Sequence, residues 1–211
     1  MEARVRHPGY RAALTALALA ACANGASRPR LETLRGPRLV QALPKPAFVL
    51  QNLDGSPYDF RQATRGRLVF LFFGYTNCPD VCPLHLANLA WAIRTLPPEQ
   101  RGAVRVVFVT TDPERDTPER LHTWLGQFDS SFVAVTGTPT ALEVAQRSVG
   151  MPPAIREGEL PKGGGYGVTH AAQLWAFTPD DSAHVVYPWG MQRQDLAADL
   201  AKLLQIWPPL P

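Results

Sequence analysis

Two cysteines separated by three residues are the part of this sequence best suited to chemistry. Cys78 and Cys82 lie in GYTNCPDVCPLHL, directly after the apolar run RLVFLFF. Two thiols this close can form a disulfide, bind a metal ion or attack a substrate. The remaining cysteine, Cys22, lies near the N-terminus, so Cys78 and Cys82 form an isolated pair.

A purely structural disulfide is the simplest role for this pair. A bridge across so short a loop removes little entropy from the unfolded chain, and a domain of this size can bury a core without it. Positions four apart on a helix have Cβ atoms about 5–6 Å apart, whereas a disulfide requires about 3.5–4.5 Å. The spacing therefore favours metal binding slightly, and a redox-active pair remains open.

Two thiolates need at least one more ligand to form a metal site, and His170 is the candidate. It follows a glycine-rich segment and directly precedes the apolar run AQLWAF. Two thiolates and an imidazole suit Cu(I), accept Cu(II) and could hold zinc, although structural zinc sites usually have four protein ligands. The sequence therefore predicts a copper site formed by Cys78, Cys82 and His170.

Other side chains that could bind copper have simpler roles. A lone histidine is more often a surface or hydrogen-bonded core residue than a ligand, and methionine usually packs. These weaker candidates are His85, His122, His184, Met151 and Met191.

A βαβ unit must position the cysteine pair. The near-continuous apolar runs at 67–73 and 104–111 are typical of strands buried on both faces, and residues 84–96 repeat apolar side chains at helical spacing. Such strands run parallel with a right-handed crossover. The cysteines would then lie at the carboxyl end of a strand, where α/β sheets carry their sites, and at a helix N-terminus, whose N–H groups favour thiolate.

The rest of the chain alternates strands and helices after an N-terminal β-hairpin. Pro118 and Pro139 each follow a threonine, a pattern typical of a helix start. The remaining predicted elements are the hairpin at 47–60 around Asp54-Gly55, helices at 117–128, 138–149 and 192–206, and strands at 132–136, 172–177 and 184–188. This order predicts an α/β fold, a three-layer sandwich.

The segment from Met151 to Thr169 has two adjacent prolines, three consecutive glycines and no periodicity, so we predict a long loop. It is a glycine-rich insertion before the last strands.

The N-terminal 21 residues have the pattern of a secretory signal peptide. Three arginines precede a short apolar run that ends in LAAC, and this end resembles the bacterial lipoprotein box. We expect a lipidated Cys22, a tether at 22–43 and a folded domain at 44–211, which predicts an extracytoplasmic, membrane-anchored protein. Ordinary signal cleavage near Ala21 or Ala23 is the alternative.

The charge pattern does not indicate nucleic-acid binding. The chain has 21 Lys and Arg against 18 Asp and Glu, and residues 1–21 hold three of the former and one of the latter. The remainder is therefore nearly neutral and has no basic stripe.

Taken together, TNCPDVCP, TTDPERDTPERL (110–121) and the histidine before a late strand resemble the Sco/SenC family over about residues 46–206. The resemblance implies a thioredoxin-like fold and copper ligands at Cys78, Cys82 and His170. It also implies a role in assembling the binuclear CuA centre of cytochrome c oxidase. The expected partners are then the CuA-bearing subunit and the membrane.

Some motif positions carry further expectations. Asp80 matches the family's acidic residue between the cysteines, whereas Thr169 replaces the aspartate that many members have before the histidine. What orients the imidazole is therefore an open question. Asp112 and Arg115 either form a turn and a charged helix start or organise the neighbouring turn. The glycine-rich segment is either a surface loop or a hinge for His170.

Two functions fit this pattern best. The first is a copper metallochaperone, and the second is a thiol–disulfide oxidoreductase in which Cys78 attacks a disulfide and Cys82 resolves the intermediate. Copper binding requires the histidine and reduction does not, so His170 discriminates between them. A peroxidase would rest on fold analogy alone. We favour the metal-delivery protein over the enzyme.

Overall fold

The computed structural model describes residues 30–159 and 165–210. The predicted signal peptide and the lipid-anchor candidate Cys22 lie outside the described residues. Within these two ranges, no helix combines the length and the hydropathy needed to cross a membrane.

A six-stranded sheet forms the middle layer, with the strand order β1-β10-β9-β4-β5-β6. The strands β4, β5 and β6 are parallel, whereas β9 is antiparallel to β4, and β10 and β1 continue the antiparallel half. Every residue of β4 is buried, as predicted for a strand covered on both faces. The strands are β1 (Arg38–Pro44), β4 (Leu68–Gly74), β5 (Val104–Thr110), β6 (Val133–Val135), β9 (Leu174–Thr178) and β10 (Ser182–Tyr187).

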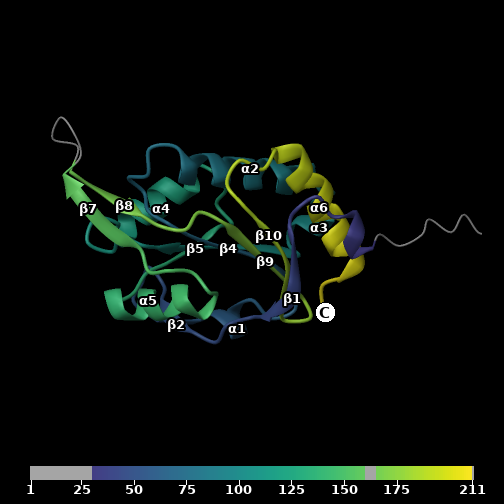
Figure 1. Cartoon of the computed structure of the whole chain (residues 1–211), viewed down its shortest axis with the longest axis horizontal. Helices are drawn as coiled ribbons and strands as arrows, with labels where there is room; N and C mark the ends of the chain where they lie inside the picture. Colours follow the sequence, from purple (N-terminus) through teal and green to yellow (C-terminus); the bar gives the residue numbers. More distant parts are fainter. Residues whose placement is uncertain (1–29, 160–164, 211) are drawn as a thin grey trace, which may run out of the picture.

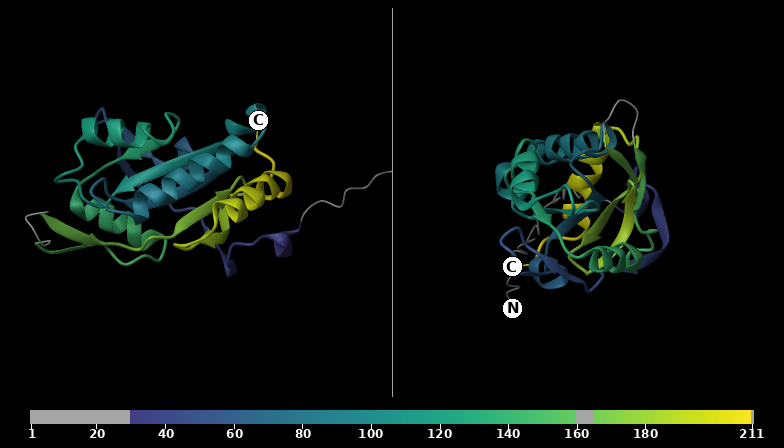
Figure 2. Two further views of the ribbon diagram at one scale, coloured as in Figure 1. Left: turned by 90° about the horizontal axis from the view of Figure 1, so that it is seen from above. Right: turned by 90° about the vertical axis from the view of Figure 1, so that its left-hand side faces the viewer.

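Helices cover both faces of this sheet (Figure 1). On one face lie α2 (Val81–Thr95), α4 (Pro118–Gly126) and α6 (Arg193–Ile206). On the other face lie α1 (Phe60–Ala63), α5 (Pro139–Ser148) and the hairpin of β2 (Val49–Gln51) and β3 (Pro57–Asp59). The short helices η1 (Leu31–Thr33) and α3 (Pro98–Arg101) complete the order, and Figure 2 shows the layers from two further sides.

Two separate apolar clusters hold the layers together. Alternate residues of the central strands point to opposite faces, so that Phe70 and Phe72 join the cluster under α2 while Leu71 and Phe73 join the other. The predicted apolar stripe of α2 is buried in the first cluster. Together with its similarity to solved structures, described below, this arrangement confirms the predicted α/β three-layer, thioredoxin-like sandwich.

The predicted tether at 22–43 is wrong for its second half. Residues 38–44 form the edge strand β1, which pairs with β10. Just before it, the buried carboxylate of Asp199 accepts hydrogen bonds from the backbone N–H groups of Arg35 and Gly36. The strand has no clear alternation of burial, and Val40 is fully exposed, which is why the sequence did not reveal it. Residues 22–29 lie outside the described residues.

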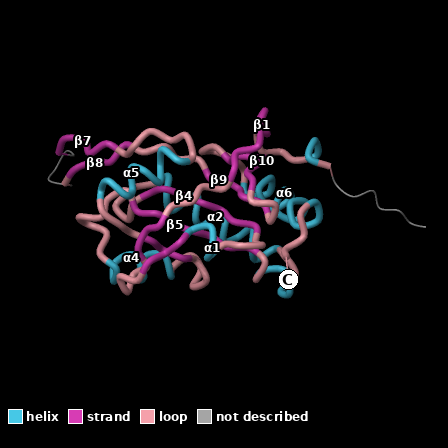
Figure 3. Tube along the Cα trace, turned by 90° about the horizontal axis from the view of Figure 1, so that it is seen from below, coloured by secondary structure: helices cyan, strands magenta, loops and turns pink. Residues whose placement is uncertain are grey.

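The predicted loop at 151–169 also contains structure. β7 (Ile155–Glu159) and β8 (Tyr166–Thr169) form an antiparallel ladder of their own, which projects from one end of the molecule (Figures 1 and 3). Backbone pairing and contacts at Tyr166 hold this ladder, and it has no apolar face. Its sequence therefore lacks the alternation of apolar and polar residues that predicts a strand.

Candidate metal centre

The sheet topology brings the three predicted ligands to one edge. The cysteine turn follows the carboxyl end of β4, and β9 is antiparallel to β4, so the residues just before β9 reach the same edge. His170 lies there. The two sulfurs and one imidazole nitrogen all lie within 4.8 Å of one another. The structure therefore places Cys78, Cys82 and His170 close enough to share one ion.

The two cysteines occupy different local structures. Cys78 lies in the turn before α2, whereas Cys82 is the second residue of the helix, so the pair does not share a helix face as the spacing had suggested. The Cys82 backbone N–H donates a hydrogen bond of 3.4 Å to the Cys78 sulfur. Both are free thiols and both are buried. The sulfur of Cys78 thus takes a helix-capping position, where negative charge is favoured.

The two thiols have opposite acidities. A hydrogen bond from the Cys82 thiol, with further ones from His170 and from the backbone N–H groups of Cys82 and Asp80, lowers the pKa of Cys78 to about 4 against the effect of burial. The same hydrogen bond, burial and the charge of Cys78 raise the pKa of Cys82. Cys78 is therefore the thiolate, and Cys82 keeps its proton. The carboxylate of Asp80 is exposed.

His170 is oriented by the main chain instead of by a carboxylate. Its Nδ1 lies 3.1 Å from the carbonyl oxygen of Ala171, and its Nε2 lies 3.5 Å from the Cys82 sulfur. With a metal ion bound, a proton on Nδ1 would donate to that carbonyl and the Nε2 lone pair would be free to bind the ion. The hydroxyl of Thr169 donates to Glu157 on β7. Ala171 thus supplies the orienting contact that Thr169 does not.

Aromatic rings enclose the imidazole. Tyr75 lies edge-to-face to His170 with ring centroids 5.6 Å apart, and Phe72 contacts it at 6.2 Å. Both rings are buried. Their packing limits the rotation of the imidazole.

A buried carboxylate shapes the turn that carries Cys78. Asp116 accepts hydrogen bonds from the backbone N–H and the hydroxyl of Thr76 and from the hydroxyl of Thr110, and burial raises its pKa. Arg120 donates to the Thr76 hydroxyl at 2.6 Å and to the side chain of Asn77. These contacts join the residues before Cys78 to the segment after β5.

Asp112 and Arg115 hold the strand that leads to His170. The Arg115 guanidinium pairs with Asp112 and donates 2.9 Å to the carbonyl of Tyr166, while the Tyr166 hydroxyl donates 2.6 Å to Asp112. The guanidinium groups of Arg115 and Arg156 each lie 3.6 Å from the centroid of the Tyr166 ring. The first residue of β8 is therefore fixed, and His170 follows a held strand instead of a free loop.

Gly74 makes room for the Cys82 sulfur. A Cβ atom on Gly74 would lie 2.8 Å from that sulfur and 3.0 Å from the ring of Phe108. Contacts this short force neighbours to move, and both are held in a packed core. Any side chain here would displace the ligand.

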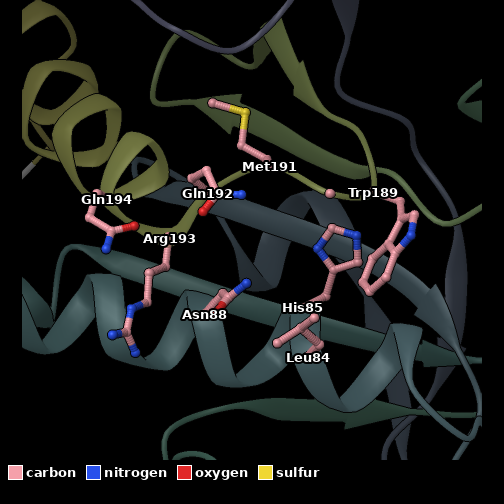
Figure 4. A pocket seen from close by; sticks show the side chains of 9 residues that line it. Leu84, His85, Asn88, Trp189, Met191, Gln192, Arg193 and Gln194 are labelled. Atoms are coloured by element: carbon pink, nitrogen blue, oxygen red, sulfur yellow. The ribbon is translucent and has the colours of Figure 1, made fainter.

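The weaker candidates lie away from the centre or serve other roles. His122 is exposed, His184 pairs with Asp180, and Met151 accepts a hydrogen bond from Trp175 in the other cluster. His85 and Met191 line a neighbouring pocket (Figure 4).

Sequence reasoning missed the residues that hold the turn, namely Gly74, Thr76, Asp116 and Arg120. The available signal was that Asp116 and Arg120 belong to the same motif as Asp112 and Arg115.

Comparison with known proteins gives a consistent result. Residues 39–205 match the family model described as SCO1/SenC. A protein of Stutzerimonas stutzeri, whose given name provisionally calls it copper-binding, is 35% identical over 161 residues, which are 72% of this chain and 74% of that protein. Mitochondrial Protein SCO1 of Saccharomyces cerevisiae is 28% identical over 159 residues, and the match spans about half (52%) of its length.

Solved structures with the same fold include relatives with and without copper. Apo Sco1 from Thermus thermophilus has a TM-score of 0.71 at 33% identity, with 82% of this chain and 98% of that one covered. Arabidopsis thaliana ScoI, a structure with copper bound, has a TM-score of 0.69 at 28% identity, with 79% of this chain and all (100%) of that one covered.

Proposed function

The chain belongs to the SCO1/SenC family, and on that premise we propose that it is a copper metallochaperone for the CuA centre of cytochrome c oxidase. It binds one copper ion through Cys78, Cys82 and His170 and passes that ion to the CuA-bearing subunit. The observation that carries the proposal is the mutual distance of the three ligand atoms, all within 4.8 Å. The relatives solved with copper bound support the choice of metal.

The donor atoms of this site suit a copper ion. Two sulfurs and one imidazole suit Cu(I) and leave fewer protein ligands than a closed zinc site requires. In the free protein Cys82 keeps its proton because its pKa is raised, so loading copper replaces that proton and releases it to water. A site of three ligands leaves copper accessible to a fourth ligand from the receiving protein, so transfer proceeds by ligand exchange.

The redox state of Cys78 and Cys82 decides whether this site can bind copper. Oxidation of the Cys78 thiolate and the Cys82 thiol to a disulfide passes two electrons to an external oxidant and releases one proton. It removes both sulfur ligands, so only the reduced protein carries copper. Both cysteines are free thiols here.

Membrane attachment follows the sequence prediction. We place the protein outside the cytoplasm, anchored by a lipid on Cys22, with a short tether before the folded domain at η1. Membrane attachment would hold the metal centre near a membrane-bound oxidase. Mass spectrometry of the purified chain tests this directly, because lipidation adds the mass of acyl chains to a mature N-terminal Cys22.

One observation favours a second function, thiol–disulfide oxidoreductase. Opposite pKa shifts make Cys78 an attacking thiolate and Cys82 a protonated partner, the division of roles that reduction of a disulfide requires. Cys78 would attack the disulfide of the oxidised CuA cysteines and form a mixed disulfide, which releases the first of those cysteines as a thiolate. Cys82 would then lose its proton, attack the Cys78 sulfur and release the second partner cysteine. Both electrons come from the pair, which ends as a disulfide.

His170→Ala separates the two functions. The variant should lose copper delivery to the reduced CuA-bearing domain, because one of three ligands is gone, whereas its reduction of that oxidised domain should stay near the wild-type rate. His122→Ala is the matched control, since that histidine is exposed and away from the centre. Delivery is followed by the absorption of the assembled CuA centre, and reduction by thiol counting.

Wild-type delivery from a His170→Ala variant would refute the metallochaperone proposal. A mixed disulfide trapped by Cys82→Ser, together with unimpaired delivery by the alanine variant, would leave the oxidoreductase as the function.

A further inference from the structure

A pocket beside the metal centre is lined by none of the three predicted ligands. Its volume is about 470 Å³, and it lies between the first turns of α2 and the segment that leads into α6 (Figure 4). The residues that line it are Leu84, His85, Asn88, Trp189, Gly190, Met191, Gln192, Arg193 and Gln194. Because His85 follows Cys82 by three residues, the pocket lies less than one helical turn from a copper ligand.

A buried nitrogen in the pocket has no partner. The side chain of His85 is only 5% exposed, and its Nε2 makes no hydrogen bond to the described residues. An unpaired buried polar atom costs free energy whichever tautomer the ring adopts. An occupant whose polar group met this nitrogen after a small turn of the ring would remove that cost.

Two large apolar side chains at this pocket are exposed. Trp189 and Leu84 are 45% and 48% exposed, and the indole of Trp189 lies edge-to-face to His85 at 5.4 Å. Tryptophan and arginine are the residues most enriched at the energetic centres of protein interfaces. An exposed tryptophan beside a pocket is thus typical of a protein docking site. A small polar ligand would not need so large an exposed apolar side chain.

The charge of the pocket indicates its occupant. Arg193 is its only charged lining residue, its guanidinium lies 4.8 Å from the Trp91 ring centroid, and within residues 30–159 and 165–210 it forms no ion pair. A cation without an ion-pair partner favours an acidic partner and accelerates encounter with it.

We infer that this pocket receives an acidic surface segment of the protein that takes copper from Cys78, Cys82 and His170. A carboxylate of that segment faces Arg193, an apolar side chain packs on Trp189 and Leu84, and a polar group reaches His85. The inference rests on the proposed function, since the partner is the copper-receiving protein. Docking at this pocket would place the partner's ligands beside the copper for exchange.

The test measures binding separately from transfer. The CuA-bearing domain of the oxidase is titrated by calorimetry into the reduced, copper-free chain, and copper transfer from the loaded chain is then followed by absorption. Trp189→Ala should weaken binding at least about tenfold, as removal of an interface tryptophan commonly does. Arg193→Glu should weaken it by a similar factor, and more so at low ionic strength. Both variants should keep the wild-type Cu(I) affinity.

The control is Val144→Ala, which trims an apolar side chain that is 57% exposed on α5, on the opposite face of the sheet. Wild-type binding by both Trp189→Ala and Arg193→Glu would overturn the inference. A loss of Cu(I) affinity in Trp189→Ala would also overturn it. A chain that self-associates through Trp189 and does not bind the domain would also overturn it. Binding that depends on the pocket without any copper transfer would instead leave the inference standing and refute the proposed function.

Discussion

Cys78→Ser and Cys82→Ser are each expected to lower the affinity for Cu(I) by about 10²- to 10³-fold. Structural zinc sites with four ligands bind with about 10–16 kcal/mol, so one ligand contributes ~2.5–4 kcal/mol, and we expect a similar loss for a thiolate on Cu(I). Serine keeps the size of the side chain but provides a hard, protonated hydroxyl in place of a soft thiolate. Because both sulfurs are buried, water cannot readily take the place of the sulfur that the substitution removes.

Anaerobic competition titrations with a chromophoric Cu(I) chelator measure this loss. All variants carry Cys22→Ala, so that the remaining thiols are those of the site. Wild type should bind one copper per chain when reduced and none as the disulfide. Full affinity in both serine variants would show that copper binds elsewhere.

Alkylation should distinguish the two cysteines by more than about a hundredfold in rate at pH 7, because one is a thiolate and the other is protonated. The pKa of Cys78 is lowered to about 4, so its reaction with iodoacetamide should stay nearly constant from pH 8 to pH 5 and fall as protonation begins below that range. The pKa of Cys82 is raised, and its buried thiol should remain unmodified throughout.

Tandem mass spectrometry of the alkylated peptide that contains both cysteines assigns each adduct. The matched control is the chain unfolded in guanidinium chloride, in which both thiols should titrate near the ordinary value of about 8.5. A folded protein in which Cys82 reacts first, or in which Cys78 loses reactivity already between pH 9 and pH 7, would contradict the assignment of the thiolate.

The sequence predicted the central fold because its signals were strong and local. Two long apolar runs around a periodic segment fix a βαβ unit, and Asp54-Gly55 fixes the hairpin, where Gly55 has a φ of +82°. The edge strand β1 and the β7–β8 ladder escaped prediction, because backbone pairing holds them without a continuous apolar face. Such pairing depends on distant residues that a local pattern does not contain.

The three predicted ligands could also be identified from local signals in the sequence. The positions of Cys78 and Cys82 after a buried strand, and of His170 before another, place all three at sheet ends. The supporting contacts were not predictable, because Asp116, Thr76 and Gly74 matter through three-dimensional packing around the sulfurs. The orienting carbonyl of Ala171 belongs to the main chain and has no sequence signature.

X-ray absorption spectroscopy of the reduced, Cu(I)-loaded chain tests the central claim most directly, because it counts the atoms bonded to copper. A single ion held by Cys78, Cys82 and His170 should give two sulfur neighbours and one nitrogen neighbour. The imidazole contribution should disappear in His170→Ala and persist in His122→Ala. A shell of sulfur alone in the wild type, or a nitrogen that survives His170→Ala, would contradict the proposed centre.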